Sequence, residues 1–288
     1  MLYLFSFKAK KADELKPNQM KIKGNTVLIT GAASGIGKIM GRIALEKGAS
    51  RLVIWDINEA AVEAVCKEFS TLGNVSGFKA DISDPESLDA ALEATKAACG
   101  KIDILINCAG IITNNKPFYE QSDDDIRRTI GINTNGAMFL TRRVIGDMIS
   151  AGKGHICNIT SAGGMLAMPK MSIYAASKWA AIGWSESMRI ELEEAGIPVH
   201  VTTVAPYFIN TGMFEGIRSK VFKIQKPEKV AAKTIRAIEK NRIFIGIPFG
   251  FHFIRLMQGI FPFRLFDPFF GHLFGLYTVM DHYTGRKK

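Results

Sequence analysis

The chain has 288 residues, 47% of them hydrophobic, which suffices for one large domain or two small ones. Its formal net charge of +10 lies entirely in residues 216–288, which hold 14 Lys and Arg against 4 Asp and Glu. This basic segment interleaves its charges with phenylalanines and carries no nucleic-acid-binding motif. We therefore exclude nucleic acid as a partner and favour an anionic membrane surface.

The N-terminal segment, residues 1–23, opens with a short apolar run and continues with lysines. The run is too short for a membrane span or for the core of a signal peptide, so we expect no signal peptide. Three placements of the segment are open: on a membrane, packed against the C-terminal tail, or as a loose terminus. The four cysteines lack the spacing of metal ligands or disulfide partners, which predicts reduced thiols, an intracellular protein and no metal site.

A short apolar strand at residues 26–29 runs straight into a glycine-rich turn, and a helix follows. In such a turn Gly31 permits the sharp bend, Gly35 lets the backbone approach a pyrophosphate, and Gly37 lets the helix pack on the strand. The helix N-terminus adds N–H donors and a positive dipole end. The G-x-x-x-G-x-G spacing in this context predicts a dinucleotide site, the alternative being a glycine turn without a ligand.

The second predicted strand, residues 51–55, is followed at once by Asp56. A carboxylate at this place can accept hydrogen bonds from a ribose diol and repels a 2′-phosphate. Ile57 and Asn58 come next, and neither is a cation that could bind that phosphate. The sequence thus predicts NAD rather than NADP, although Asp56 could also cap the following helix.

The chain continues with alternating helices and apolar strands up to residue 248. This alternation predicts an α/β fold: a single Rossmann-like doubly wound parallel sheet of about seven strands, with helices on both faces. Its ligand crevice is expected at the carboxyl ends of the strands. We expect three parts, namely the segment 1–23, a dinucleotide-binding catalytic domain at 24–248 and an aromatic, basic C-terminal extension at 249–288.

Small and polar residues follow two later strands. Asn107, Ala109 and Gly110 end the fourth strand, and Ser161 ends the fifth, so these side chains are expected at the crevice. Asn133 interrupts the apolar pattern of a helix predicted at 122–150, and a buried asparagine must find hydrogen-bond partners. A local structural hydrogen bond is the alternative role for Asn133.

Tyr174 and Lys178 stand four residues apart in a segment predicted as helix, so their side chains lie on one face. A nearby cation favours phenolate over phenol, which predicts a pKa of Tyr174 below its ordinary value. Such a tyrosine can exchange a proton with an alcohol or carbonyl oxygen. Taken alone, the pair is also compatible with an ordinary helix surface.

Large apolar side chains fill the loop at 205–214, which suggests a greasy lid over a substrate site. Ten of the nineteen phenylalanines lie between residues 244 and 274, where Pro248, Pro262 and Pro268 break the run, so no membrane-spanning helix is expected. Short amphipathic pieces lying in a membrane interface fit this pattern. A cover over the substrate pocket and an oligomer interface are the alternatives.

Taken together, these motifs resemble the short-chain dehydrogenase/reductase family over residues 22–248. The resemblance implies that Tyr174 is the catalytic acid/base and that Lys178 binds the nicotinamide ribose and lowers the pKa of Tyr174. It also implies that Ser161 holds the substrate oxygen and that Asn133 holds a water in a proton relay.

The same resemblance implies two sets of ligand contacts. The expected cofactor contacts are Gly31, Ser34, Gly35, Ile36, Gly37, Asp56, Asp81, Ile82, Asn107, Ala109, Gly110, Tyr174, Lys178, Pro206 and Thr211. The expected substrate contacts are Ser161, Gly163, Tyr174, Tyr207, Met213 and Phe214. Two residues depart from the family pattern: Cys108 replaces a common second Asn, and Tyr207 replaces a glycine, which should narrow the space near the nicotinamide.

Within the family, the segments 55–58, 206–209 and 211–216 and the aromatic tail resemble the membrane-associated branch of retinol dehydrogenases and lipid-droplet 17-beta-hydroxysteroid dehydrogenases. This implies hydride transfer between NAD(H) and a lipophilic alcohol or carbonyl (retinoid-, steroid- or fatty-alcohol-like). It also implies a homodimer or homotetramer, peripheral on the cytoplasmic side of a membrane or on a lipid droplet. The alternatives are a non-catalytic dinucleotide-binding membrane or lipid-droplet protein and a soluble NADPH-dependent 3-oxoacyl reductase.

Overall fold

The computed structural model describes residues 20–220, 222–273 and 275–285. Most of the N-terminal segment therefore lies outside the described residues, together with the expectation for its placement. Its last residues are described, and there Met20 and Ile22 are buried against the core of the domain.

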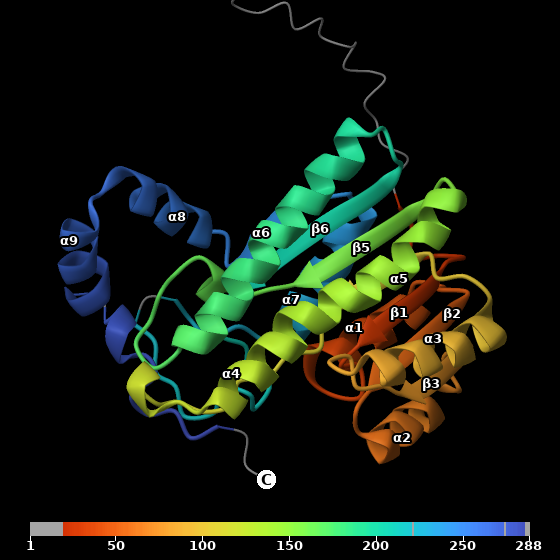
Figure 1. Cartoon of the computed structure of the whole chain (residues 1–288), viewed down its shortest axis with the longest axis horizontal. Coiled ribbons are helices and arrows are strands. Elements are labelled where there is room, and N and C mark those ends of the chain that lie inside the picture. The colour runs from red at the N-terminus through yellow and green to blue at the C-terminus, as the bar shows by residue number, and fades with distance from the viewer. Residues whose placement is uncertain (1–19, 221, 274, 286–288) are drawn as a thin grey trace, which may run out of the picture.

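A parallel sheet of seven strands forms the middle layer of the molecule, which confirms the predicted architecture (Figure 1). The central strands are apolar on both faces, as expected where helices cover both sides of a parallel sheet. The order across the sheet is β3-β2-β1-β4-β5-β6-β7. The strands are β1 (Thr26–Thr30), β2 (Arg51–Asp56), β3 (Val75–Lys79), β4 (Ile104–Asn107), β5 (Gly154–Ile159), β6 (Val199–Pro206) and β7 (Phe244–Ile247).

Alternate residues of each strand face opposite helix layers. In β1, Val27 and Ile29 belong to one apolar cluster and Leu28 to the other. The first cluster contains residues of α1 (Gly35–Glu46), α2 (Glu59–Phe69) and α7 (Pro227–Glu239). The second contains residues of α3 (Pro85–Cys99), α5 (Ala137–Ser150) and α6 (Ser172–Glu194).

The strand order reverses between β1 and β4, which places a crevice at the carboxyl ends of these two strands. Hydrogen bonds connect the ends of β1 and β4 at this place. The hydroxyl of Thr30, at the end of β1, accepts from the backbone N–H groups of Cys108 (3.0 Å) and Ala109 (3.1 Å), just after β4. The two loops that are expected to bind ligands are therefore fixed to each other.

The prediction of a single helix at 122–150 is wrong in detail. The segment consists of α4 (Asp123–Ile130), a π-helical turn (Gly131–Gly136) and α5. Glycines at both ends of the turn weaken the α-helical preference. A side chain at Gly136 would also collide with Ile82, because its Cβ would lie 2.7 Å from the Ile82 carbonyl oxygen.

The C-terminal extension folds into α8 (Phe251–Ile260), α9 (Phe263–Phe266), a π-helical turn (Asp267–Leu273) and a short helical turn (Leu276–Thr278). Figure 1 shows α8 and α9 projecting from the sheet domain at one end of the molecule. Among the described helices, none combines the length and the apolar character that crossing a bilayer requires.

Candidate active site

The glycine turn has the backbone shape that sequence reasoning requires. Gly31 and Gly35 adopt left-handed φ values of +66° and +55°, a region that L side chains rarely adopt. A Cβ on Gly37 would lie 2.3 Å from the carbonyl oxygen of Gly31, so α1 can approach β1 only because this residue is glycine. The turn therefore requires glycine at these positions.

The N-terminus of α1 is prepared for an anion. Ser34 is its N-cap residue and makes no side-chain cap hydrogen bond, whereas Asn58, Asp84 and Ser122 do cap α2, α3 and α4. The N–H donors of the first turn of α1 therefore lack a side-chain acceptor and suit a phosphate. The glycine cradle and this uncapped N-terminus together fit a dinucleotide.

A groove runs from this turn across the sheet edge. Many of the predicted cofactor contacts line it: the glycine turn, Asp56, Asp81 and Ile82, and further along Ala109 and Gly110. Asp81 itself accepts from the N–H (2.9 Å) and hydroxyl (2.6 Å) of Ser83, which fixes its carboxylate at the groove.

Asp56 lines the groove beside the glycine turn. Its carboxylate accepts from the N–H of Ala33 in the glycine turn (3.2 Å) and from the N–H of Asn58 (3.2 Å). The alternative role as a helix cap is wrong, because Asn58 caps α2 by accepting from Ala61 N–H at 3.1 Å. Asp56 therefore orders the glycine turn and lines the groove, and it does not cap α2.

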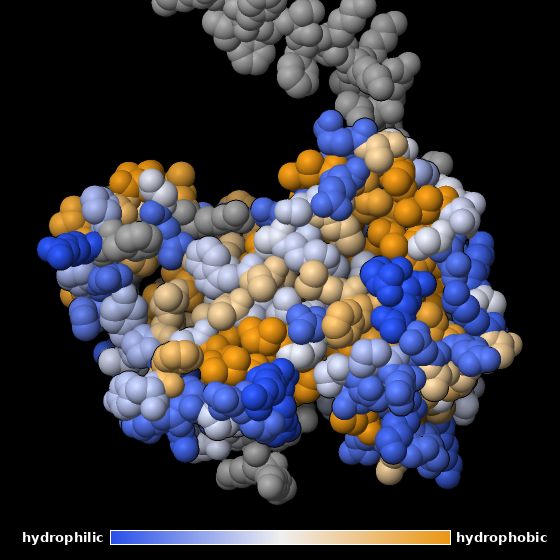
Figure 2. All heavy atoms as spheres, viewed as in Figure 1, coloured by the Kyte–Doolittle hydropathy of each residue, from blue (hydrophilic) through white to orange (hydrophobic). Residues whose placement is uncertain are grey.

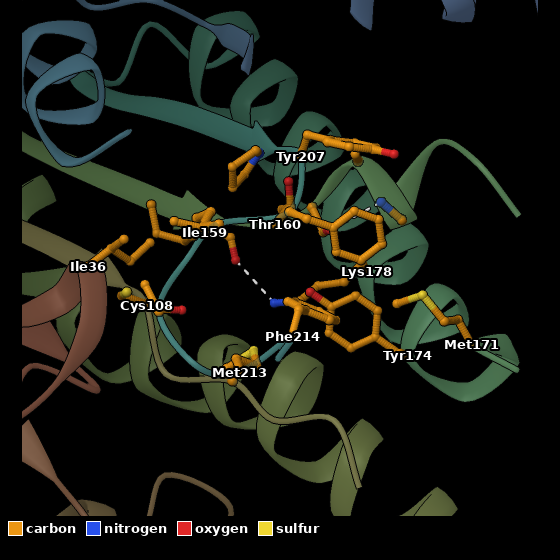
Figure 3. A pocket seen from close by; sticks show the side chains of 18 of the residues that line it. Ile36, Cys108, Ile159, Thr160, Met171, Tyr174, Lys178, Tyr207, Met213 and Phe214 are labelled. Atoms are coloured by element: carbon orange, nitrogen blue, oxygen red, sulfur yellow. Dashed lines mark hydrogen bonds between the residues drawn. The ribbon is translucent and has the colours of Figure 1, made fainter. Parts of the chain in front are cut away.

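The predicted catalytic side chains Ser161, Tyr174 and Lys178 line one cavity that adjoins the groove (Figure 3). Lys178 Nζ donates to the Ile159 carbonyl at 3.2 Å and lies 5.8 Å from the centre of the Tyr174 ring. Ser161 Oγ accepts from Gly163 N–H at 3.0 Å, which orients the hydroxyl. The end of β5 and the first turns of α6 thus bring the three together.

The expectation for the pKa of Tyr174 is wrong in this structure. Burial raises the pKa of the phenol from 10.0 to about 12, and the hydrogen bond with Ser161 opposes only part of the shift. Burial also lowers the pKa of the Lys178 ammonium from 10.5 to about 8. Loss of hydration decides the direction of the shift, so Tyr174 is a neutral proton donor at pH 7.

The two predicted asparagines are both buried in structural hydrogen bonds. The side chain of Asn133 accepts from Ile111 N–H (2.7 Å) and donates to the Ile111 carbonyl (2.9 Å) and to Ser177 Oγ (3.0 Å). Its local structural role is thereby confirmed, while the water relay stays a prediction. The Asn107 amide donates to Thr141 (3.0 Å) and Asn158 (2.8 Å), and Asn107 is absent from the walls of the groove and of the catalytic cavity.

Apolar side chains make up most of the remaining cavity wall. Pro206, the last residue of β6, lies in this wall together with Thr211, Met213 and Phe214 from the loop that follows. Sequence reasoning missed Met168, Met171 and Phe208. The two methionines follow Ser161 by 7 and 10 residues in the loop before α6. Their place between two predicted catalytic residues could have indicated that they line the cavity.

Tyr207 lines the catalytic cavity next to Pro206, and its narrowing of the space near the nicotinamide stays a prediction. Its ring is buried among Phe208, Phe222 and Phe251, with centroid distances of 4.8, 5.5 and 6.4 Å. Its hydroxyl bonds to Ser219 Oγ at 2.8 Å. Tyr207 is one of the cavity-lining residues in Figure 3, and the contact of its ring with Phe251 connects the loop to the C-terminal extension.

Comparisons with known proteins agree with this geometry. The family model for short chain dehydrogenases matches residues 25–221. Epidermal retinol dehydrogenase 2 of Mus musculus is 32% identical over 279 residues, covering 95% of this chain and 89% of the relative. Estradiol 17-beta-dehydrogenase 11 of Homo sapiens is 31% identical over 245 residues, covering 84% of this chain and 81% of that protein.

Among solved structures, a short chain dehydrogenase/reductase from Burkholderia phymatum in complex with NAD superposes with a TM-score of 0.76 at 26% identity. The match covers 83% of this chain and 95% of that one. The matched family region contains the glycine turn, Ser161, Tyr174 and Lys178 in the arrangement described above. The chain belongs to the short-chain dehydrogenase family of oxidoreductases.

Proposed function

We propose that the protein is an NAD-dependent dehydrogenase or carbonyl reductase for lipophilic alcohols and their carbonyl products. The observation that carries this proposal is the composition of one cavity. Polar side chains converge at Ser161, Tyr174 and Lys178, while Met168, Met171 and Phe214 supply apolar wall around them. A site of this kind binds an apolar molecule and fixes one oxygen.

Each residue has a defined task in this reaction. When bound, NAD supplies the hydride acceptor or donor at its nicotinamide ring. Tyr174 holds a proton at neutral pH and donates it to a carbonyl oxygen, becoming a phenolate. In the opposite direction the phenolate, formed by loss of that proton, accepts the proton of the alcohol. Ser161 orients the substrate oxygen toward that phenol.

Lys178 has two tasks. Its ammonium, fixed by the Ile159 carbonyl, lies beside Gly110, where a Cβ would come within 3.4 Å of Nζ. Because Gly110 has no side chain, the ammonium stays accessible to a ribose hydroxyl. Its charge also favours the phenolate that forms when Tyr174 gives up its proton.

The substrate class rests on the cavity and is supported by the relatives, whose names refer to retinol and estradiol. The test is turnover of retinol, estradiol, dodecanol and ethanol with NAD+, followed by nicotinamide absorbance. We expect turnover of at least one lipophilic alcohol and none of ethanol. An acyl-chain ketone reduced with NADPH in preference to NADH would instead support the 3-oxoacyl reductase. Absence of turnover with every substrate would support the non-catalytic alternative.

We further propose that residues 249–273, here called the C-terminal lobe, bind a membrane or lipid-droplet surface. Eight of the eighteen exposed large hydrophobic side chains of the described residues lie in this short segment, and Figure 2 shows hydrophobic residues at its outer end. The eight are Phe249, Phe253, Leu256, Ile260, Phe261, Leu265, Phe269 and Leu273. The net positive charge of residues 216–288 adds attraction to anionic lipids.

Substitution of Leu256, Leu265 and Leu273 together by serine is expected to reduce binding to vesicles at least tenfold. Each leucine is 56–70% exposed and would lose a burial free energy of about 1.5 kcal/mol or more, of which 1.4 kcal/mol already gives a factor of ten. The measurement is flotation of the full chain with phosphatidylcholine–phosphatidylserine vesicles. The control carries serine at Leu72, Ile149 and Ile190, which are exposed elsewhere. Flotation of the lobe variant at the wild-type level would contradict the assignment.

The quaternary structure stays a prediction from the family resemblance, a homodimer or homotetramer. Peripheral placement on the cytoplasmic side of a membrane likewise belongs to this proposal and rests on the C-terminal lobe.

A further inference from the structure

The last described part of the chain, residues 276–285, leaves the lobe and returns to the substrate site. We call it the C-terminal strap. Its apolar residues Leu276, Val279 and Met280 are each at most 2% exposed. They belong to the same buried cluster as Met168, Met171 and Tyr174, which line the catalytic cavity. The strap is therefore built into the substrate side of the molecule.

Four contacts fasten the strap to three different loops at the carboxyl edge of the sheet. The Asn115 amide donates to the Met280 carbonyl at 2.9 Å, and Lys170 forms an ion pair with Asp281 at 3.0 Å. In the loop after β6, Arg218 N–H donates to Val279 (3.3 Å) and Glu215 accepts from Thr284 N–H (2.9 Å).

Backbone packing against this loop is very close. Gly216 has φ = +83°, and a Cβ placed there would lie 2.1 Å from the carbonyl oxygen of His282. The loop that carries Phe214 can pack this closely against the strap only with glycine at this position. The strap thus constrains a loop that forms part of the cavity wall.

The side chain of Tyr283 connects the strap to the cavity wall. The ring of Tyr283 in the strap lies 6.4 Å from the ring of Phe214, centre to centre. Phe214 in turn makes edge-on contacts with Phe208 at 4.9 Å and with the catalytic Tyr174 at 5.7 Å. Figure 3 shows Phe214 beside the Tyr174 ring at the cavity.

From this chain of contacts we infer that the strap is a specificity element of the enzyme, in which Tyr283 positions Phe214 as the wall that limits substrate width beside Tyr174. The inference rests on the proposed function. Tyr283 is a positioning residue, because it acts through Phe214. A broad alcohol would need Phe214 to move away from Tyr174, and the strap opposes that movement.

The test compares dodecanol with cyclododecanol, which have the same number of carbons but different widths. In Tyr283→Ala, the ratio of kcat/KM for the cyclic over the linear alcohol is expected to rise about tenfold, typical of a small change in an apolar pocket. Phe214→Ala should show a rise at least as large. Tyr283→Ala added to Phe214→Ala should change the ratio no further, because the residue through which it acts is gone.

Two variants separate positioning from general destabilisation. Tyr283→Phe keeps the ring and should retain the wild-type ratio. His282→Ala, next to it with an exposed side chain, should retain it as well. A ratio that is unchanged in Tyr283→Ala, or one that changes equally in His282→Ala, would overturn the inference.

A readout without substrate keeps this inference distinct from the proposed function. Hydrogen–deuterium exchange of residues 207–220 should be faster in Tyr283→Ala than in wild type, Tyr283→Phe and His282→Ala. Equal exchange in all four proteins would refute the positioning role even if the enzyme oxidises both alcohols. If the wild type oxidises neither alcohol, the exchange rates still decide whether the strap orders the loop. The proposed function itself fails only if retinol and estradiol are not oxidised either.

Discussion

Replacing Tyr174 with phenylalanine is expected to lower kcat by roughly 10³-fold, within the range that general acid–base catalysis contributes. The variant keeps the aromatic ring and therefore the contact with Phe214, and it loses only the hydroxyl. Because the phenol is buried and its pKa is raised to about 12, it carries the proton that a carbonyl oxygen needs. No other phenol lines the catalytic part of the cavity in the described residues except Tyr207, whose hydroxyl bonds to Ser219.

The loss should appear in turnover and not in nucleotide binding. The Kd for NADH, measured by nicotinamide fluorescence, should change by less than about threefold, since the glycine turn and Asp56 are untouched and threefold is well below one kcal/mol. Tyr119→Phe, at an 85% exposed position, is the control and should behave as the wild type. Turnover of a lipophilic alcohol by Tyr174→Phe at the wild-type rate would refute the proposed chemistry.

The sequence predicted those parts of the fold that depend on local pattern. Alternating strands and helices set the parallel sheet, and the strand, glycine turn and helix at 26–47 located the nucleotide groove. Ser161, Tyr174 and Lys178 were predictable because each stands at a strand end or at helical spacing. Such features require only short-range geometry and the rule that ligands bind at the carboxyl ends of parallel strands.

The errors arose where distant segments decide the outcome. The sequence places Lys178 near Tyr174 but does not reveal how deeply both are buried, and burial reversed the direction expected for the pKa of Tyr174. Likewise, the sequence does not reveal that the ring of Tyr207, which lines the cavity, packs against Phe222 and Phe251. Neither partner is recognisable from the segment around Tyr207.

The C-terminal tail illustrates the same limit. Its phenylalanine content predicted an apolar surface but left a membrane contact, a pocket cover and a subunit interface as alternatives. The structure divides the described tail into a lobe with many exposed apolar side chains and a buried strap beside the catalytic cavity. The division depends on contacts with Asn115, Lys170 and Glu215, which are 69 to 165 residues distant in sequence from their partners in the strap.

Exchanging Asp56 for serine is expected to remove most of the preference for NAD over NADP. In the wild type, a carboxylate at the groove faces the position of a 2′-phosphate, and placing like charges together costs several kcal/mol. Taking about 2.7 kcal/mol of this repulsion gives a preference for NADH over NADPH of roughly 100-fold. Serine removes the repulsion and retains a hydroxyl for the ribose, so the preference should fall below about tenfold.

The measurement is the Kd of each reduced cofactor by fluorescence titration of the full chain. NADPH should bind more tightly to Asp56→Ser than to the wild type, and NADH more weakly, because the serine is a poorer acceptor for the ribose hydroxyls and for Ala33 N–H. Glu59→Gln removes the same charge three residues away, on an exposed side chain paired with Lys79 at 3.5 Å, and should leave both constants unchanged. Tighter binding of NADPH than NADH by the wild type would show that Asp56 does not select the cofactor, because a carboxylate hydrogen-bonded to the ribose cannot accommodate a phosphate at the same place.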